Sequence, residues 1–183
     1  MAFSQQDTEC MALALKLSKK GRASVGANPM VGCVITRDGR IVAQDYHRKY
    51  GKSHAEVNAL DQIKHQGKGT KLYVTLEPCS HQGKTPPCTK ALIKAGIKNV
   101  VVAMLDPNPM VSGRGVKLLN DAGIEVDIGL LQNEARELNR GFVKRMETGM
   151  PFVTTKIAMS LDGGTAMASG ESQWITSDAA RLD

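Results

Sequence analysis

The chain has 183 residues, of which 42% are hydrophobic and 4% aromatic, so it suits one domain of ordinary size with some chain left over. No run approaches the roughly 18 apolar residues of a membrane span, and residues 1–6 lack the features of a signal peptide, so we expect a cytoplasmic protein. The net charge of +6 suits an anionic ligand, either a nucleic acid or a phosphorylated metabolite, although scattered lysines and arginines are equally typical of a solvated surface.

Hydrophobic periodicity predicts helices and strands that alternate along the chain. In chain order these are a helix over 7–20, strands over 31–36 and 41–46 joined by a hairpin turn at Asp38-Gly39, a helix over 55–65, a strand over 72–76, a helix over 88–95, a strand over 100–104, a helix over 115–122, a strand over 124–128, a helix over 133–146 and a strand over 152–158. The alternation after the hairpin indicates a three-layer α/β/α sandwich with a mixed central sheet.

The character of the chain changes at Thr148-Gly149-Met150-Pro151, a Pro/Gly break of the kind found at domain boundaries. After it, a strand and a glycine-rich turn follow without a partner helix. We therefore predict a first domain over residues 1–147, and over 148–183 a linker and the incomplete start of a second α/β domain.

Three residues offer a metal ion one imidazole and two thiolates: His54, Cys79 and Cys88. Three protein ligands leave the fourth tetrahedral position of zinc for water, which is the arrangement of catalytic rather than structural sites. The alternatives are a structural zinc site, in which His81 could supply the fourth ligand, or no metal at all. Two disulfides are a weaker use of the four cysteines, because the chain has no secretory signal.

Glu56 lies two residues beyond His54, close enough to face the same water. Deamination of a pyrimidine needs a proton on the ring nitrogen and another on the departing amine, and one carboxylate can carry both. Glu77, just before Pro78-Cys79, is a weaker candidate for a pocket role, such as holding a ligand amine. Cys88 is predicted to begin a helix, where the helix dipole lowers the pKa of a thiol.

These motifs resemble two related families. His54-Ala55-Glu56 together with Pro78-Cys79 resembles the cytidine deaminase superfamily, although the segment from Cys79 to Cys88 is longer than the usual Pro-Cys-x-x-Cys. That longer loop, with 28–32 and 106–109, is similar to the deaminase half of the bifunctional riboflavin-biosynthesis deaminase/reductases. The resemblance implies a cytidine-deaminase-like fold and hydrolytic deamination of 2,5-diamino-6-ribosylamino-4(3H)-pyrimidinone 5′-phosphate, with zinc as the cofactor.

The resemblance also implies a substrate site that contains Asn28, His47, His81, Lys84 and Thr85. Asn28 can both donate to and accept from a pyrimidine edge, and Lys84 offers a point charge to a phosphate. Asp106 and Asn108, on a loop after a strand, could bind ribose hydroxyls. Each residue has a structural alternative, because asparagines before prolines also shape turns and His47 or Lys84 could simply be solvated.

The last segment resembles the opening of an NADPH-dependent reductase domain, on the basis of residues 156–163 and 172–176. The resemblance implies that Ala158 and Trp174 contact NADPH and that Ser172 contacts the reductase substrate. Most of a reductase is absent from these residues, so we expect this chain alone neither to bind NADPH well nor to reduce a substrate.

The main rival is another zinc deaminase, acting on adenosine in transfer RNA or on free cytidine. The basic charge suits RNA, but the chain lacks an aromatic-rich basic surface for stacking bases. A second rival is a zinc-stabilised binding module without enzymatic activity. We expect a phosphorylated ribosylaminopyrimidine as the ligand, no nucleic-acid or membrane partner, and assembly into a homo-oligomer.

Overall fold

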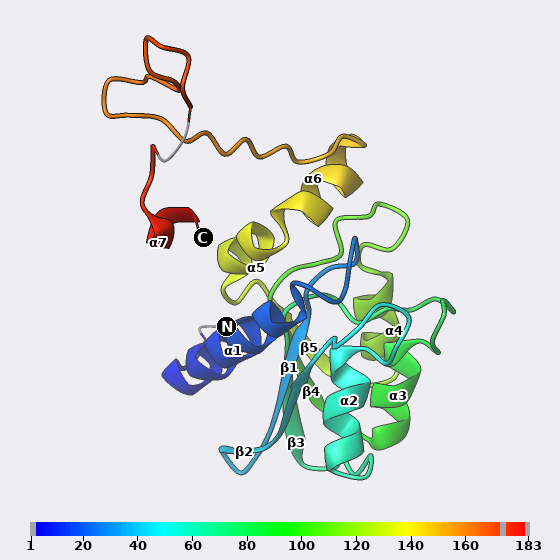
Figure 1. The fold of residues 1–183 in the computed structure, drawn as a ribbon. Helices are drawn as coiled ribbons and strands as arrows, with labels where there is room; N and C mark the ends of the chain where they lie inside the picture. Colours follow the sequence, from blue (N-terminus) through cyan, green and yellow to red (C-terminus); the bar gives the residue numbers. More distant parts are fainter. Residues whose placement is uncertain (1–2, 173–174, 182–183) are drawn as a thin grey trace. The chain divides into compact units, whose positions relative to one another are not determined.

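The computed structural model describes residues 3–172 and 175–181 (Figure 1). The chain forms two compact units, residues 1–152 and residues 153–183, and each is described by itself below. The sequence places the domain boundary a few residues earlier, between 147 and 148. None of the helices in the described ranges is long and apolar enough to cross a membrane.

The first unit is built on a five-stranded sheet with the strand order β2-β1-β3-β4-β5. Its strands are β1 (Gly32–Arg37), β2 (Arg40–Tyr46), β3 (Thr70–Val74), β4 (Asn99–Val102) and β5 (Glu125–Ile128). β1 pairs antiparallel with both β2 and β3, whereas β3, β4 and β5 run parallel. The predicted mixed sheet is confirmed. The hairpin turn has positive φ at Asp38 (49°) and Gly39 (74°), as a two-residue turn between twisted strands requires.

Helices cover both faces of the sheet, so the predicted three layers are confirmed (Figure 1). α2 (Ala55–Gln62), α3 (Cys88–Ala95) and α4 (Arg114–Asp121) lie on one face, and α1 (Gln5–Ser18) lies on the other. Strand side chains alternate between the two faces. Accordingly, Cys33 and Ile35 of β1 join the buried cluster under α2 and α3, while Val34 joins the cluster under α1.

The predicted helix over 133–146 is wrong in one respect, because it is two helices. α5 (Gln132–Leu138) ends and α6 (Arg140–Thr148) begins at Asn139. Asn139 has the non-helical backbone angles φ −107° and ψ 24°, and its buried side chain bonds to a distant loop rather than to the helix. A long-range contact therefore divides a segment whose apolar spacing alone suits one helix.

The predicted strand over 152–158 is also wrong, because residues 151–160 have irregular backbone. A strand needs a paired neighbour, and no strand forms within 153–172 or 175–181. This second unit contains instead a turn closed by the bond from the Gly163 N–H to the Ser160 carbonyl, at 2.9 Å, and the short helix α7 (Asp178–Arg181).

Candidate active site

The three predicted metal ligands converge at the carboxyl ends of the central strands. His54 is the N-cap of α2, Cys79 lies in the loop after β3, and Cys88 is the first residue of α3. His54 Nδ1 lies 3.2 Å from Cys88 Sγ and 3.5 Å from Cys79 Sγ. The ligands of a tetrahedral zinc ion are roughly 3.5 Å apart, as its bond lengths dictate. One nitrogen and two sulfurs at this spacing therefore fit zinc.

His54, Cys79 and Cys88 form the one group of potential metal ligands found among the described residues, with all ligand atoms within 4.8 Å of one another. His81 is not part of that group, and its side chain is exposed on the pocket wall. A set of three protein ligands leaves a coordination position for a water or a substrate. This geometry favours the catalytic interpretation over a closed structural zinc site.

The lowered thiol pKa that the sequence predicts for Cys88 is found instead on Cys79. The hydrogen bond from the Cys88 thiol, with further bonds from His54 and from the Cys88 backbone N–H, lowers the pKa of Cys79 to about 4. The Cys88 N–H, the free donor at the start of α3, donates to Cys79 Sγ at 3.3 Å. The bond to Cys79, together with complete burial, raises the pKa of Cys88. The helix terminus thus stabilises a thiolate on Cys79.

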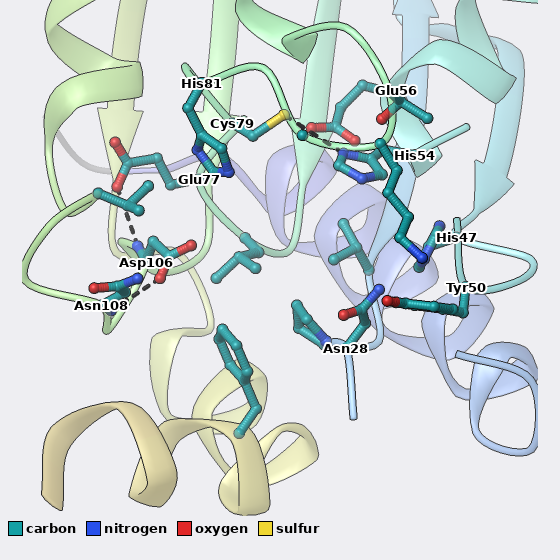
Figure 2. Close-up of a pocket in the computed structure, with 18 of the residues that line it drawn as sticks. Asn28, His47, Tyr50, His54, Glu56, Glu77, Cys79, His81, Asp106 and Asn108 are labelled. Carbon is teal, nitrogen blue, oxygen red and sulfur yellow. Dashed lines mark hydrogen bonds between the residues drawn. The ribbon is translucent and has the colours of Figure 1, made fainter. Parts of the chain in front are cut away.

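Glu56 is the second residue of α2 and is 3% exposed. Burial, and to a smaller extent the negative charge of Cys79, raises the pKa of Glu56 to about 7. Its Oε2 has no hydrogen-bond partner, and its carboxyl group lies close to the His54 ring (Figure 2). A buried carboxyl oxygen without a partner is costly unless a ligand uses it, so this oxygen is available to a bound water or substrate.

His47 also has a buried ring nitrogen without a hydrogen-bond partner. It lies just after β2, is 4% exposed, and contacts the His54 ring edge to face at a centroid distance of 5.2 Å. Burial, and also the proximity of His54, lowers the pKa of His47, which favours the neutral ring. Its Nδ1 lies 3.2 Å from the Ser53 carbonyl, which can only accept. Nδ1 therefore carries the proton, and the buried Nε2, which has no partner, is left as an acceptor.

A pocket of about 380 Å³ surrounds these groups (Figure 2). The structure brings every residue predicted for the deaminase substrate site to its wall, namely Asn28, His47, His81, Lys84, Thr85, Asp106 and Asn108. Sequence reasoning missed further lining residues, including Tyr50, Lys52, Phe142 and Met146. Tyr50 is the most informative of them, because the Lys84 ammonium lies 4.1 Å from the centre of its ring. An aromatic residue shortly before His54 in the sequence was the available signal, although it does not report the contact with Lys84.

Asp106 and Asn108 form consecutive turns on the loop after β4. The Asn108 N–H donates to Asp106 Oδ1 at 2.9 Å, and the Met110 N–H donates to Asn108 Oδ1 at 3.0 Å. Burial raises the pKa of Asp106, and the charge of Glu77 adds to that effect. Both side chains thus shape the loop as well as lining the pocket, so the turn-forming alternative given for Asn108 is confirmed, while ligand binding by either residue stays a prediction.

Glu77 cannot hold a ligand amine in the way the sequence suggests. Its carboxylate is buried and accepts four backbone N–H bonds, two on each oxygen. A carboxylate has about four acceptor positions, so none is left for a ligand. Glu77 therefore has a structural role, in which its carboxylate holds backbone N–H groups in place.

The residues predicted to serve a reductase lie in the second unit. Ala158 is exposed, and the Ser172 hydroxyl donates to the Thr165 carbonyl at 2.9 Å. Trp174 lies outside the described residues.

Comparison with known proteins identifies the family. Residues 4–104, more than half of the chain, match the cytidine and deoxycytidylate deaminase zinc-binding region. The chain belongs to this zinc-binding deaminase family. The match includes His54, Glu56 and Cys79, and the presence of a zinc-binding deaminase domain agrees with the ligand set described above. Residues 151–183 match a second family, the RibD C-terminal domain.

Relatives of this chain differ in length. The riboflavin biosynthesis protein RibD of Escherichia coli is 57% identical over 97% of this chain but only 48% of its own length. The diaminohydroxyphosphoribosylamino-pyrimidine deaminase of Buchnera aphidicola subsp. Schizaphis graminum is 52% identical over 80% of this chain and 99% of its own length. The solved structure of Acinetobacter baumannii RibD superimposes with a TM-score of 0.92 at 55% identity, covering 97% of this chain and 50% of that one. The cytidine-deaminase-like fold is confirmed, and the chain spans about half the length of the RibD relatives.

Proposed function

We propose that this chain catalyses the hydrolytic deamination of 2,5-diamino-6-ribosylamino-4(3H)-pyrimidinone 5′-phosphate to the corresponding 5-aminouracil, a step of riboflavin biosynthesis. The observation that carries the proposal is the unpartnered Glu56 oxygen beside the His54, Cys79 and Cys88 ligand set, at the bottom of a pocket. The choice of substrate is supported by the Buchnera relative named for this activity, of which the chain covers 99%.

A zinc ion held by His54, Cys79 and Cys88 would lower the pKa of a bound water to about 7 and so supply hydroxide at neutral pH. Glu56 accepts the proton that the water gives up and delivers it to the pyrimidine ring nitrogen. It then takes the remaining proton of the added hydroxyl group, as a carbonyl forms on the ring, and gives this proton to the departing amino group, which leaves as ammonia. Burial raises the pKa of the Glu56 carboxyl group, which suits a group that must both take up and release a proton.

The remaining pocket residues bind the substrate in this proposal. His47 Nε2 accepts a hydrogen bond from the substrate, since its Nδ1 proton is committed to Ser53. Asn28 pairs with the pyrimidine edge, and Lys84, held at the pocket mouth by Tyr50, binds the phosphate. Asp106 and Asn108 face the ribose, with His81 and Thr85 completing the wall.

The test is ammonia release from the diaminopyrimidinone ribosyl phosphate, with zinc measured on the same sample. Free cytidine and an adenosine-containing transfer RNA are run beside it, because they are the substrates of the rival deaminases. Release from the first substrate alone, with about one zinc per chain, is the expected result. Release from the transfer RNA or from cytidine instead would overturn the choice of substrate.

We further infer that residues 151–183, which match the RibD C-terminal domain, serve NADPH-dependent reduction in the longer relatives. Ala158, Ser172 and Trp174 are the positions proposed for cofactor and substrate contacts. A cytoplasmic location and a homo-oligomeric state stay predictions.

A further inference from the structure

Glu77 joins two loops of the pocket wall, the loop that follows β3 and the loop that follows β4. Its backbone N–H donates to the Met104 carbonyl at 3.0 Å, which extends the pairing of β3 with β4 beyond the strands themselves. The next two residues are Pro78 and the metal ligand Cys79. Its side chain is 4% exposed and points to the loop after β4, as Figure 2 shows for Asp106.

The four bonds to the Glu77 carboxylate all come from that loop and from the start of α4. Oε2 accepts from the N–H groups of Asp106 (3.1 Å) and Gly113 (3.0 Å). Oε1 accepts from those of Gly115 (2.8 Å) and Val116 (3.2 Å). One buried carboxylate thus fixes both ends of the segment 106–113, which carries Asp106 and Asn108.

The start of α4 depends on Glu77, because the N-cap residue of α4 has no side chain that could accept a hydrogen bond. The cap residue is Gly113, which has no side chain. The Arg114 N–H donates to the Val111 carbonyl at 3.0 Å, and the next two N–H groups of the helix are those that Glu77 accepts. Glu77 therefore supplies the acceptors that the N-cap residue Gly113 lacks, although the two residues are 36 positions apart in the sequence.

The same helix start is pressed against the metal loop. A Cβ added at Gly115 would lie 2.1 Å from the Pro78 carbonyl oxygen. Real Cβ atoms do not approach a backbone oxygen so closely, so the contact requires glycine. Charge and close approach together hold the first turn of α4 beside Cys79.

We propose that Glu77 is a positioning residue that sets the place of Asp106 and Asn108 relative to the metal ligand Cys79, and thereby the affinity of the pocket for its substrate. This inference rests on the proposed function. Removing the negative charge of Glu77 should release the segment 106–113 and leave the ligand set and Glu56 intact, since neither bonds to Glu77.

The variant Glu77→Gln keeps the shape of the side chain but replaces one acceptor oxygen by an NH2 group that faces backbone N–H donors. We expect KM for the diaminopyrimidinone ribosyl phosphate to rise about tenfold, the loss typical of hydrogen bonds to a charged group. We expect kcat to change less than about threefold and the zinc content to be unchanged. The matched control is Glu134→Gln, the same change on an exposed residue of α5, for which KM should not move.

A role confined to stability would give a different result, namely a lower melting temperature and a smaller active fraction with KM unchanged. That result would overturn the inference. If the wild-type chain releases no ammonia from this substrate, it is the proposed function that fails. Amide hydrogen exchange then decides the inference by itself: exchange at Asp106, Gly113, Gly115 and Val116 should be slow in the wild type and accelerated by Glu77→Gln, while the amides of α2 stay unchanged.

A second variant keeps the inference testable if Glu77→Gln does not fold. Gly115→Ala leaves the Glu77 charge in place, but the added Cβ would lie 2.1 Å from the Pro78 carbonyl oxygen and 3.1 Å from Glu77 Oε1, so the start of α4 must move away from both. Alanine is also the better helix former, which offsets part of the strain. A rise in KM with unchanged zinc content is expected. Unchanged KM in this folded variant, or unprotected wild-type amides at the four positions, would overturn the inference.

Discussion

The side chain of Asn139 pairs with both backbone groups of Met30, a residue 109 positions away in sequence. The Met30 N–H donates to Asn139 Oδ1 at 2.8 Å, and Asn139 Nδ2 donates to the Met30 carbonyl at 3.0 Å. Asn139 is 5% exposed, so water does not replace these bonds easily. Because Met30 directly follows Asn28-Pro29, the break between α5 and α6 helps to fix one wall of the pocket.

Replacing this amide should destabilise the protein. In Asn139→Leu the backbone N–H and carbonyl of the half-buried Met30 both lose their partner, at a cost of about 1–3 kcal/mol in the free energy of unfolding. Urea denaturation measures the change. Asn133→Leu, the same substitution on an exposed position of α5, should stay within about 0.5 kcal/mol of the wild type. Equal effects of the two variants would show that the pairing contributes nothing.

The ligand set and the layered fold were predictable from the sequence, because their signals are local. His54 and Glu56 are two residues apart, and both Cys79 and Cys88 stand next to prolines at the ends of periodic segments. Local spacing determines which residues lie at a helix start or beyond a strand, and the topology then brings these ends to one edge of the sheet.

What the sequence could not supply are contacts between distant segments. The Cys88 N–H donates to Cys79, so the thiol whose pKa is lowered is Cys79 and not Cys88, for which the sequence predicts it. The acceptor positions of the Glu77 carboxylate are occupied by N–H groups of a segment that begins 29 residues later. Tyr50 and Lys84 meet across the pocket mouth. Each of these depends on packing, and no spacing rule in the sequence reports it.

Glu56→Gln should abolish turnover while zinc stays bound. Gln has nearly the same shape but cannot accept and return a proton, so we expect kcat to fall by about 10²–10⁴-fold. Zinc content and the melting temperature of the folded chain should be close to those of the wild type. Unchanged ammonia release would exclude Glu56 as the proton carrier and would favour a zinc-stabilised binding module.

Removing zinc should expose one cysteine to alkylation. Cys79 is partly exposed, whereas Cys10, Cys33 and Cys88 are 5%, 0% and 0% exposed. After treatment with a chelator, iodoacetamide should label Cys79 at least about tenfold faster than the others, because reaction needs an accessible thiolate. Zinc-loaded protein should be protected at Cys79. Peptide mass spectrometry measures the labelling rates with and without zinc. Equal labelling of Cys79 in the two samples would contradict its role as a ligand.

A buried network at the start of α1 should make stability depend on acidity. Asp7 Oδ1 accepts from Lys71 Nζ at 2.7 Å and from the Tyr73 hydroxyl at 2.8 Å, and Asp7 Oδ2 accepts from the Ser4 N–H at 3.0 Å. Burial alone would raise the pKa of Asp7, but the bonds from Lys71, Ser4 and Tyr73 outweigh it and hold the pKa well below its usual range. The folded state therefore releases the Asp7 proton more readily than the unfolded state.

The sign of the pH effect follows from that difference. Below the unfolded pKa of about 3.9 the unfolded chain takes up a proton that the folded chain does not, so the stabilisation by Asp7 is complete above about pH 5 and is lost as the pH falls towards the folded pKa. Asp7→Asn should lower the free energy of unfolding by about 1–3 kcal/mol at pH 7, and the gap to the wild type should narrow at pH 3. Asp121→Asn, which breaks an exposed pair with Lys117, should cost less than about 0.5 kcal/mol. A gap for Asp7→Asn that stays constant from pH 7 to pH 3 would mean that the carboxylate charge is not what stabilises the network.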